Sequence, residues 1–314
     1  MKMHALSIGS AVQEFIKANS LCGAKVHSVF HRTVNLVLPG GRIVACSCGC
    51  VPQHPANITT SFACDDAALH DHVQLNALVV VERQALRVGS LEIDLQGAAT
   101  YVPTDWKAIR LCTSMDWAAH LPACVDEASC TLGSIGLGVL LPFLRTSLPR
   151  SDVTSPHAEP LLRLVWQQLG LLADALRQNE AMLPSARRLI GLGPGLTPAG
   201  DDLLAGVLAS MFAVSAAGRQ LSPALDKLRL GLYEESHGLT PDLSREMLYY
   251  ASKGQLTAVA EDVLSCMLQG KPLADSPSVS AMARYGATSG ADQFVGLVVG
   301  LRLIQQGCRW GWEQ

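Results

Sequence analysis

Residues 191–200 contain four glycines and two prolines, a density that neither a helix nor an ordinary strand accepts. The residues that follow, 201–217, have the composition of a helix. The sequence therefore predicts a rigid loop that leads the chain into a helix N-terminus. Backbone N–H groups left free at such a terminus, together with the helix dipole, attract anions such as phosphate or carboxylate. We expect the loop, from Gly193 to Asp202, to line a pocket.

Two adjacent carboxylates, Asp201 and Asp202, stand where this helix is expected to begin. A structural loop needs only one of them as N-cap, which leaves the second unexplained. Neighbouring side chains on a helix project about 100° apart, so one aspartate can cap the helix while the other faces a ligand. The segment completes neither G-x-G-x-x-G nor a P-loop with its lysine, which makes a nucleotide fold a poor fit.

A second segment repeats part of the first. Residues 200–206 and 290–296 share the pattern G-x-D-x-x-x-G, and each runs into an apolar helix. A true repeat would let two helix starts face each other across one pocket, whereas chance similarity is the alternative for so short a match. The structural reading of Gly206 and Gly296 is close helix packing.

Arginines suit an anion site because the guanidinium group donates two parallel hydrogen bonds to phosphate or carboxylate. Arg187 precedes the loop, although a solvated helix end is its alternative reading. Arg245 lies one turn into a helix that Thr240 is expected to cap. The candidate residues for binding substrate or phosphate are Gly193, Gly195, Thr197, Gly200, Ser289, Gly290, Arg187 and Arg245.

Composition excludes several classes of protein. The 314 residues carry 24 basic and 27 acidic side chains, a net charge of −3, so we expect no nucleic-acid binding. Hydrophobic residues make up 49% and charged residues only 16%, which excludes a disordered chain. The low charge favours an apolar subunit interface, such as that of a homo-oligomer.

The sequence predicts a cytoplasmic protein without membrane contact. The start of the chain lacks the apolar core of a signal peptide. The most apolar stretch, 132–144, is shorter than the roughly 20 residues of a spanning helix, and we expect a buried helix there. We expect the ten cysteines to be reduced, and we expect neither a metal site nor a cofactor.

Periodicity predicts an α+β fold, with a β-rich N-terminal domain at 1–105 and a predominantly helical C-terminal domain, carrying the Gly-rich loops, at 106–314. A short helix is expected at 11–21, and strands are expected at 26–30, 33–38, 42–48, 73–81 and 86–95. Helices are expected at 116–124, 129–145, 158–179, 201–216, 223–236, 242–253, 256–269 and 291–306.

The central motif, 189–206, reads LIGLGPGLTPAGDDLLAG and resembles the signature of a bacterial family long classed as a domain of unknown function. Its best-placed member is AllH, a subunit of oxamate carbamoyltransferase in allantoin utilisation. Residues 29–36, 243–254 and 288–292 resemble further segments of the family, so the resemblance covers most of the chain.

The resemblance implies a role beside two further subunits, one of them similar to acyl-CoA synthetases. The implied reaction converts oxalurate and phosphate into oxamate and carbamoyl phosphate, and paralogues acting on other N-carbamoyl compounds stay open. In that chemistry backbone N–H groups stabilise the charge on the attacked carbonyl oxygen. The candidate catalytic carboxylates Asp201, Asp202 and Asp292 would accept hydrogen bonds from the carbamoyl NH₂ group.

A rival hypothesis is a non-catalytic scaffold, in which the glycines only serve packing and a partner subunit carries the active site. Arginines discriminate between the two, because a catalytic subunit should gather them around the Gly-rich loop.

Overall fold

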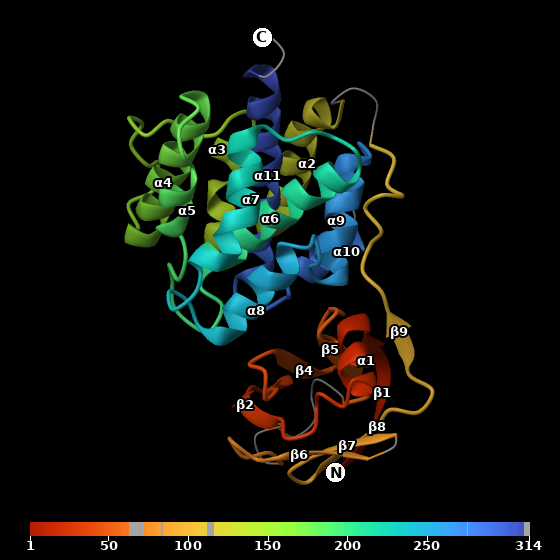
Figure 1. The fold of residues 1–314 in the computed structure, drawn as a ribbon. Helices are drawn as coiled ribbons and strands as arrows, with labels where there is room; N and C mark the ends of the chain where they lie inside the picture. The colour runs from red at the N-terminus through yellow and green to blue at the C-terminus, as the bar shows by residue number, and fades with distance from the viewer. Residues whose placement is uncertain (63–68, 70–71, 83, 112–115, 275, 311–314) are drawn as a thin grey trace. The chain divides into compact units, whose positions relative to one another are not determined.

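The computed structural model describes residues 1–62, 69, 72–82, 84–111, 116–274 and 276–310 (Figure 1). The chain divides into two compact units, Met1–Pro103 and Thr104–Gln314. The first is β-rich and the second is helical, which confirms the predicted α+β class. Each unit has its own hydrophobic core.

The N-terminal unit is a sheet built around β1 (Lys2–Gly9), which pairs antiparallel with β5 and parallel with β8 and β9. The sheet order is β2-β3-β4-β5-β1-β8-β7-β6. Its remaining strands and one helix are β2 (Lys25–Val29), β3 (Thr33–Val37), β4 (Ile43–Cys48), β5 (Asn57–Thr60), β6 (Val79–Glu82), β7 (Ala85–Val88), β8 (Leu91–Asp94), β9 (Ala99–Tyr101) and α1 (Ser10–Lys17).

The two edges of this sheet meet. The Val26 N–H donates to the Ala77 carbonyl and the Val79 N–H donates to the Ala24 carbonyl, each at 2.9 Å. These bonds join the start of β2 to the start of β6, so the sheet forms a near-barrel. A sheet that closes on itself leaves few unpaired edge groups, which removes a template for aggregation.

The sequence predicts β2, β3 and β4 well but misses β1 and β5. In β1 the buried residues include the small Ala5 and the polar Ser7, while the apolar Leu6 is exposed, so apolar alternation is absent. The strand expected at 86–95 is wrong in its extent, because Gly89 takes a φ of +60° and folds it into the β7–β8 hairpin. The strand expected at 73–81 is confirmed only from Val79 onward.

Among the described cysteines, Cys50 differs from expectation. Cys46 and Cys48 are free and buried in β4, and burial raises the pKa of the Cys46 thiol to about 12. Cys50 is disulfide-bonded, so the expectation that all cysteines are reduced is wrong there.

The helical unit packs around α11, which contacts helices from the early and the late part of the unit's sequence, from α2 to α10 (Figure 1). Its elements are α2 (Asp116–Leu132), a 3-10 helix (Gly136–Leu140), α3 (Leu141–Leu144), α4 (Pro160–Arg177), α5 (Leu183–Arg187), α6 (Ala199–Ala216), α7 (Pro223–Glu235), α8 (Asp242–Ala251), α9 (Ala258–Leu268), α10 (Pro277–Met282) and α11 (Ser289–Trp310). The short helices α5 and α10, which the sequence did not predict, precede the two long central helices.

The helix expected at 129–145 is wrong. Glycines interrupt it, since Gly136 takes a φ of +49° and a Cβ at Gly138 would lie 2.0 Å from the Leu132 carbonyl oxygen. The chain therefore leaves α2 at Leu132, turns, and continues as the 3-10 helix and α3.

Helix α6 is long and apolar enough to cross a membrane by length and composition alone. Of its apolar window, however, 83% is buried within the fold. Such a helix, apolar all round, is also what the centre of a large core requires. Its hydrophobicity is therefore accounted for by packing, above all against α11.

The α6–α11 crossing depends on two glycines that meet reciprocally. A Cβ at Gly206 would lie 2.3 Å from the Gln293 carbonyl oxygen, and a Cβ at Gly296 would lie 2.0 Å from the Leu203 carbonyl oxygen. The residues correspond at an offset of 90 positions, 203 with 293 and 206 with 296. The repeated pattern thus marks a local two-fold crossing of helices whose backbones touch.

We predict that Gly206→Ala destabilises the protein by about 2 kcal/mol or more, because the added methyl group would meet backbone that cannot move aside. Denaturant unfolding of the helical unit measures the change. Gly231→Ala in α7 is the matched control. Its Cβ would approach only the Leu183 side chain, at 3.1 Å, and alanine is the better helix former, so stability should stay or rise. Equal losses in both variants would contradict the crossing argument.

Candidate functional site

Asp201 joins the Gly-rich loop to the start of α8. Its carboxylate accepts the Gly191 N–H at 3.0 Å, the Ser244 hydroxyl at 2.8 Å and the Thr240 hydroxyl. Burial raises the pKa of Asp201, while these three donors lower it. This aspartate therefore holds the loop in place from inside the protein.

Neither aspartate caps α6. The N-cap position is Pro198, so Asp201 and Asp202 lie within the first turn, and the predicted aspartate cap is wrong. Thr240 is likewise not the N-cap of α8, which is Pro241. In each case the helix start differs from the sequence-based expectation because the side chain makes a tertiary contact instead.

Asp292 has a similar structural role in α11. It accepts the Leu137 N–H at 2.6 Å and the Thr288 hydroxyl at 2.7 Å, and it is fully buried. Its Oδ1 lies 2.4 Å from where a Cβ of Gly136 would be, so only glycine fits there. Burial raises the pKa of Asp292 to about 6, against the lowering effect of its two donors.

Asp202 differs from both, because one of its oxygens lacks a partner. Oδ1 accepts the Gln293 amide Nε2 at 3.4 Å, whereas Oδ2 is buried and makes no hydrogen bond of ordinary geometry in the described part of the chain. Burial raises the pKa of Asp202 well above 3.8, the nearby Ser289 hydroxyl and Gln293 lower it, and the charges of Asp292 and Asp201 raise it further.

Gln293 adds a second buried acceptor. Its Oε1 is also buried without a hydrogen-bond partner among the described residues. Buried polar groups are rarely left unpaired, since each costs about 1–3 kcal/mol. The two acceptors lie on side chains already bonded to each other, and the N–H donors of a ligand would satisfy both of them.

The Gly-rich loop reaches this pair of side chains through Thr197. The Thr197 hydroxyl lies 3.3 Å from the Ser289 hydroxyl, which joins the starts of α6 and α11. The N–H groups of Gly193, Gly195 and Thr197 make no hydrogen bond to any residue that the structure describes. Gly193 and Gly195 have φ values of +121° and +93°, and the tip around Gly195 is exposed.

The other two candidate glycines serve packing. Gly200 and Gly290 are buried, and a Cβ on either would lie 2.0 Å from a carbonyl oxygen, that of Leu189 or of Met282. Both therefore allow a helix start to sit against the preceding segment, and their backbones face protein.

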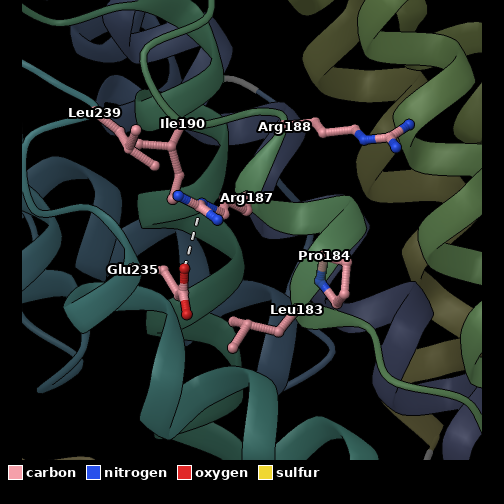
Figure 2. A pocket seen from close by; sticks show the side chains of 7 residues that line it. All are labelled: Leu183, Pro184, Arg187, Arg188, Ile190, Glu235 and Leu239. Carbon is pink, nitrogen blue, oxygen red and sulfur yellow. Dashed lines mark ion pairs between the residues drawn. The ribbon is translucent and has the colours of Figure 1, made fainter.

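The two candidate arginines lie elsewhere. Arg187 lines a cavity of about 580 Å³ between α5 and α7, where its Nε is 3.3 Å from Glu235 (Figure 2). No residue of the segment from Gly193 to Asp202 lines that cavity. The cavity therefore does not support the prediction that this loop lines a pocket. The Arg245 guanidinium stacks on the Tyr233 ring, 4.6 Å from its centroid.

Among the residues that the structure describes, no three or more His, Cys, Asp or Glu side chains lie close enough together to hold a metal ion.

Sequence reasoning missed several residues of this cluster. Gln293 stands inside the second G-x-D-x-x-x-G segment, at a position where the first segment has Leu203, and this difference was the available signal. The hydroxyl of Tyr285 had no such signal, but burial and the nearby Asp202 raise its pKa. Of the three predicted catalytic aspartates, Asp202 is the one with a carboxylate oxygen for which the described residues provide no hydrogen bond of ordinary geometry.

Fold and site together define a two-unit α+β protein with paired loop-to-helix motifs around buried acids. A family model for oxamate carbamoyltransferase subunit AllH matches residues 189–301, and a model for the AllH family N-terminal domain matches residues 4–100. The chain belongs to the AllH family, as its sequence predicts. The two matches cover about two thirds of the chain. No solved structure matches it.

The region matched by the AllH model contains Asp202, Gln293, Ser289 and Thr197, which we call the Asp202 cluster. It begins just before the Gly-rich loop and ends within α11, so it includes both Asp202 and Asp292, whereas Arg187 falls outside it. Use of the candidate residues in substrate binding or catalysis stays a prediction.

We predict that Asp292 makes stability depend on pH in a defined direction. Because its pKa is raised from 3.8 to about 6, the folded protein keeps a proton that the unfolded chain has lost between these values. This contribution is present below about pH 4 and is lost as the pH rises through 6. Relative to Asp292→Asn, the native protein should lose roughly 2.4 kcal/mol between pH 4 and pH 7.

Denaturant unfolding at a series of pH values measures this difference. Gly231→Ala, which changes no titratable group, is the control and should shift stability equally at each pH. A pH-independent difference for Asp292→Asn would show that this acid titrates as it does in the unfolded chain.

Proposed function

We propose that this protein is a subunit of a carbamoyltransferase of the oxamate carbamoyltransferase type, and that the Gly-rich loop with the Asp202 cluster is its small-molecule site. The proposal rests on the family and on one observation in particular. The two unpaired acceptors, Asp202 Oδ2 and Gln293 Oε1, are buried where the starts of α6 and α11 meet.

These acceptors match the donors of a carbamoyl group. An N-carbamoyl compound presents an NH₂ group with two N–H bonds, and acceptors on two linked side chains can orient it. Such a ligand would remove the cost of burying both oxygens unpaired. A site built on hydrogen bonds to NH₂ also rejects analogues that lack it.

The loop supplies donors for the carbonyl oxygen of the same carbamoyl group. A phosphate oxygen attacks the ureido carbonyl carbon of oxalurate, and the bond from this carbon to the oxamate nitrogen breaks. The oxamate nitrogen takes a proton, and carbamoyl phosphate leaves as the second product. The unengaged N–H groups of Gly193, Gly195 and Thr197 can stabilise the charge that builds on the carbonyl oxygen. Access requires the segments around Asp202 to rearrange, since Asp202 is only 3% exposed.

The scaffold hypothesis remains the second candidate, and two observations favour it. Asp201 and Asp292 hold backbone N–H groups and hydroxyls of this protein, as structural carboxylates do. Neither Arg187 nor Arg245 makes a described contact with the Gly-rich loop. In that case the two further subunits of the enzyme, one of them similar to acyl-CoA synthetases, would carry the chemistry in the cytoplasm.

Substitution of Asp202 separates the two hypotheses. We predict that Asp202→Asn lowers carbamoyl phosphate formation by the reconstituted enzyme at least tenfold, about 1.4 kcal/mol of transition-state stabilisation. The amide turns one acceptor into a donor, which opposes the substrate NH₂. The melting temperature should change little, because Asn matches the shape of Asp and keeps one oxygen as an acceptor for the Gln293 amide.

Asp226→Asn is the matched control, because Asp226 is a first-turn aspartate of another helix, α7. It should keep both turnover and melting temperature. If Asp202→Asn also keeps full turnover, the cluster is structural and the scaffold hypothesis takes its place.

A further inference from the structure

The cavity beside Arg187 lies outside the cluster just described. It is lined by Leu183, Pro184, Arg187, Arg188, Ile190, Glu235 and Leu239, and its volume of about 580 Å³ is within the usual range of small-molecule sites. We propose that it is a second binding site, which takes a monoanion that joins one carboxylate to a short apolar body.

The charges of the lining favour a single negative charge. Two arginines and one glutamate line the cavity, so one positive charge is left for a ligand to neutralise. Arg187 contacts Glu235 through Nε, at 3.3 Å, and its two Nη nitrogens make no hydrogen bond to any residue in the described ranges. Figure 2 shows Arg187 and Glu235 pointing toward each other, with Arg188 directed away from this pair.

Glu235 sets the limit on the charge of the ligand. A carboxylate can bind the outer edge of the Arg187 guanidinium while Glu235 keeps its contact with Nε. A phosphate dianion carries one negative charge more than a carboxylate. That extra charge would lie close to the Glu235 carboxylate, which repels it. The site should therefore discriminate against phosphate, in contrast to the backbone donors of the Gly-rich loop.

The walls require an apolar part of the ligand. Four of the seven lining residues are apolar, namely Leu183, Pro184, Ile190 and Leu239. Leu239 is 39% exposed, so a ligand that covers it gains the free energy of removing apolar surface from water. Each added CH₂ group in contact with these walls should therefore strengthen binding.

The site also borders the Gly-rich loop without being part of it. Ile190 directly precedes Gly191, and the Leu239 carbonyl oxygen lies 2.3 Å from where a Cβ of Gly191 would be. The absence of a Cβ at Gly191 is thus what lets this wall of the cavity close.

Calorimetric titration of the whole chain with acetate, butanoate and hexanoate tests the proposal. We expect affinity to rise at least threefold for every two carbons added, and inorganic phosphate and hexanol to bind at least tenfold more weakly than hexanoate. Arg187→Gln should weaken hexanoate binding at least tenfold. Glu235→Gln should strengthen it several-fold, because it releases Arg187 and removes the repelling charge.

Two further variants keep the test sharp. Arg219→Gln, at an exposed arginine outside the cavity, should bind hexanoate as the native protein does. Leu239→Asn should leave acetate binding unchanged but reduce the gain from chain length. The proposal is overturned if the carboxylates do not bind saturably, if affinity ignores chain length, if phosphate binds as well as hexanoate, or if Arg219→Gln loses as much as Arg187→Gln.

Discussion

The contact between the backbones of α6 and α11 is the constraint on which the helical unit depends. Gly206 faces the Gln293 carbonyl, and Gly296 faces the Leu203 carbonyl, at distances that exclude any side chain. Because both helices are buried along nearly their whole described length, most of the other helices of the unit pack against one or both of them. Contact this close also places the two helix N-termini, with their acidic first turns, beside each other. The crossing therefore accounts for the position of the buried acids.

Three carboxylates in such a place would repel one another if all were charged. Burial raises the pKa values of Asp201, Asp202 and Asp292, and the charges of Asp292 and Asp201 raise that of Asp202 further. The protein offsets part of this cost by giving two of them donors from distant segments, the turn at Leu137 and the start of α8. Each of these bonds ties a distant segment to the start of α6 or α11. Through these bonds, the acids set where the surrounding segments lie relative to the α6–α11 crossing.

The sequence indicates the fold class, the family and the Gly-rich loop because each depends on local patterns. The glycines at 191–200 exclude regular structure whatever surrounds them, and the repeated motif does mark corresponding positions in two helices. The partners of the aspartates could not be predicted, since Asp201 bonds Ser244 43 residues away and Asp292 bonds Leu137 155 residues away. Strands β1 and β5 escaped prediction for a related reason, as they bury Ser7, Asn57 and Thr60, which carry no apolar pattern.

The local two-fold relation also shows where the two halves of the motif have diverged. Asp202 and Asp292 occupy corresponding positions, yet the turn at Leu137 donates an N–H group to Asp292, and Asp202 has no such donor for its Oδ2 among the described residues. At the next position, one half has the apolar Leu203 and the other has Gln293, whose Oε1 is also unpaired. If both halves only supported packing, an apolar residue at 293 would serve as well as it does at 203 and would avoid the cost of burying an amide. The unpaired acceptors therefore come one from each half, Asp202 from α6 and Gln293 from α11, at the positions where the two halves differ. Packing does not explain them, which is the physical reason to look for a ligand there.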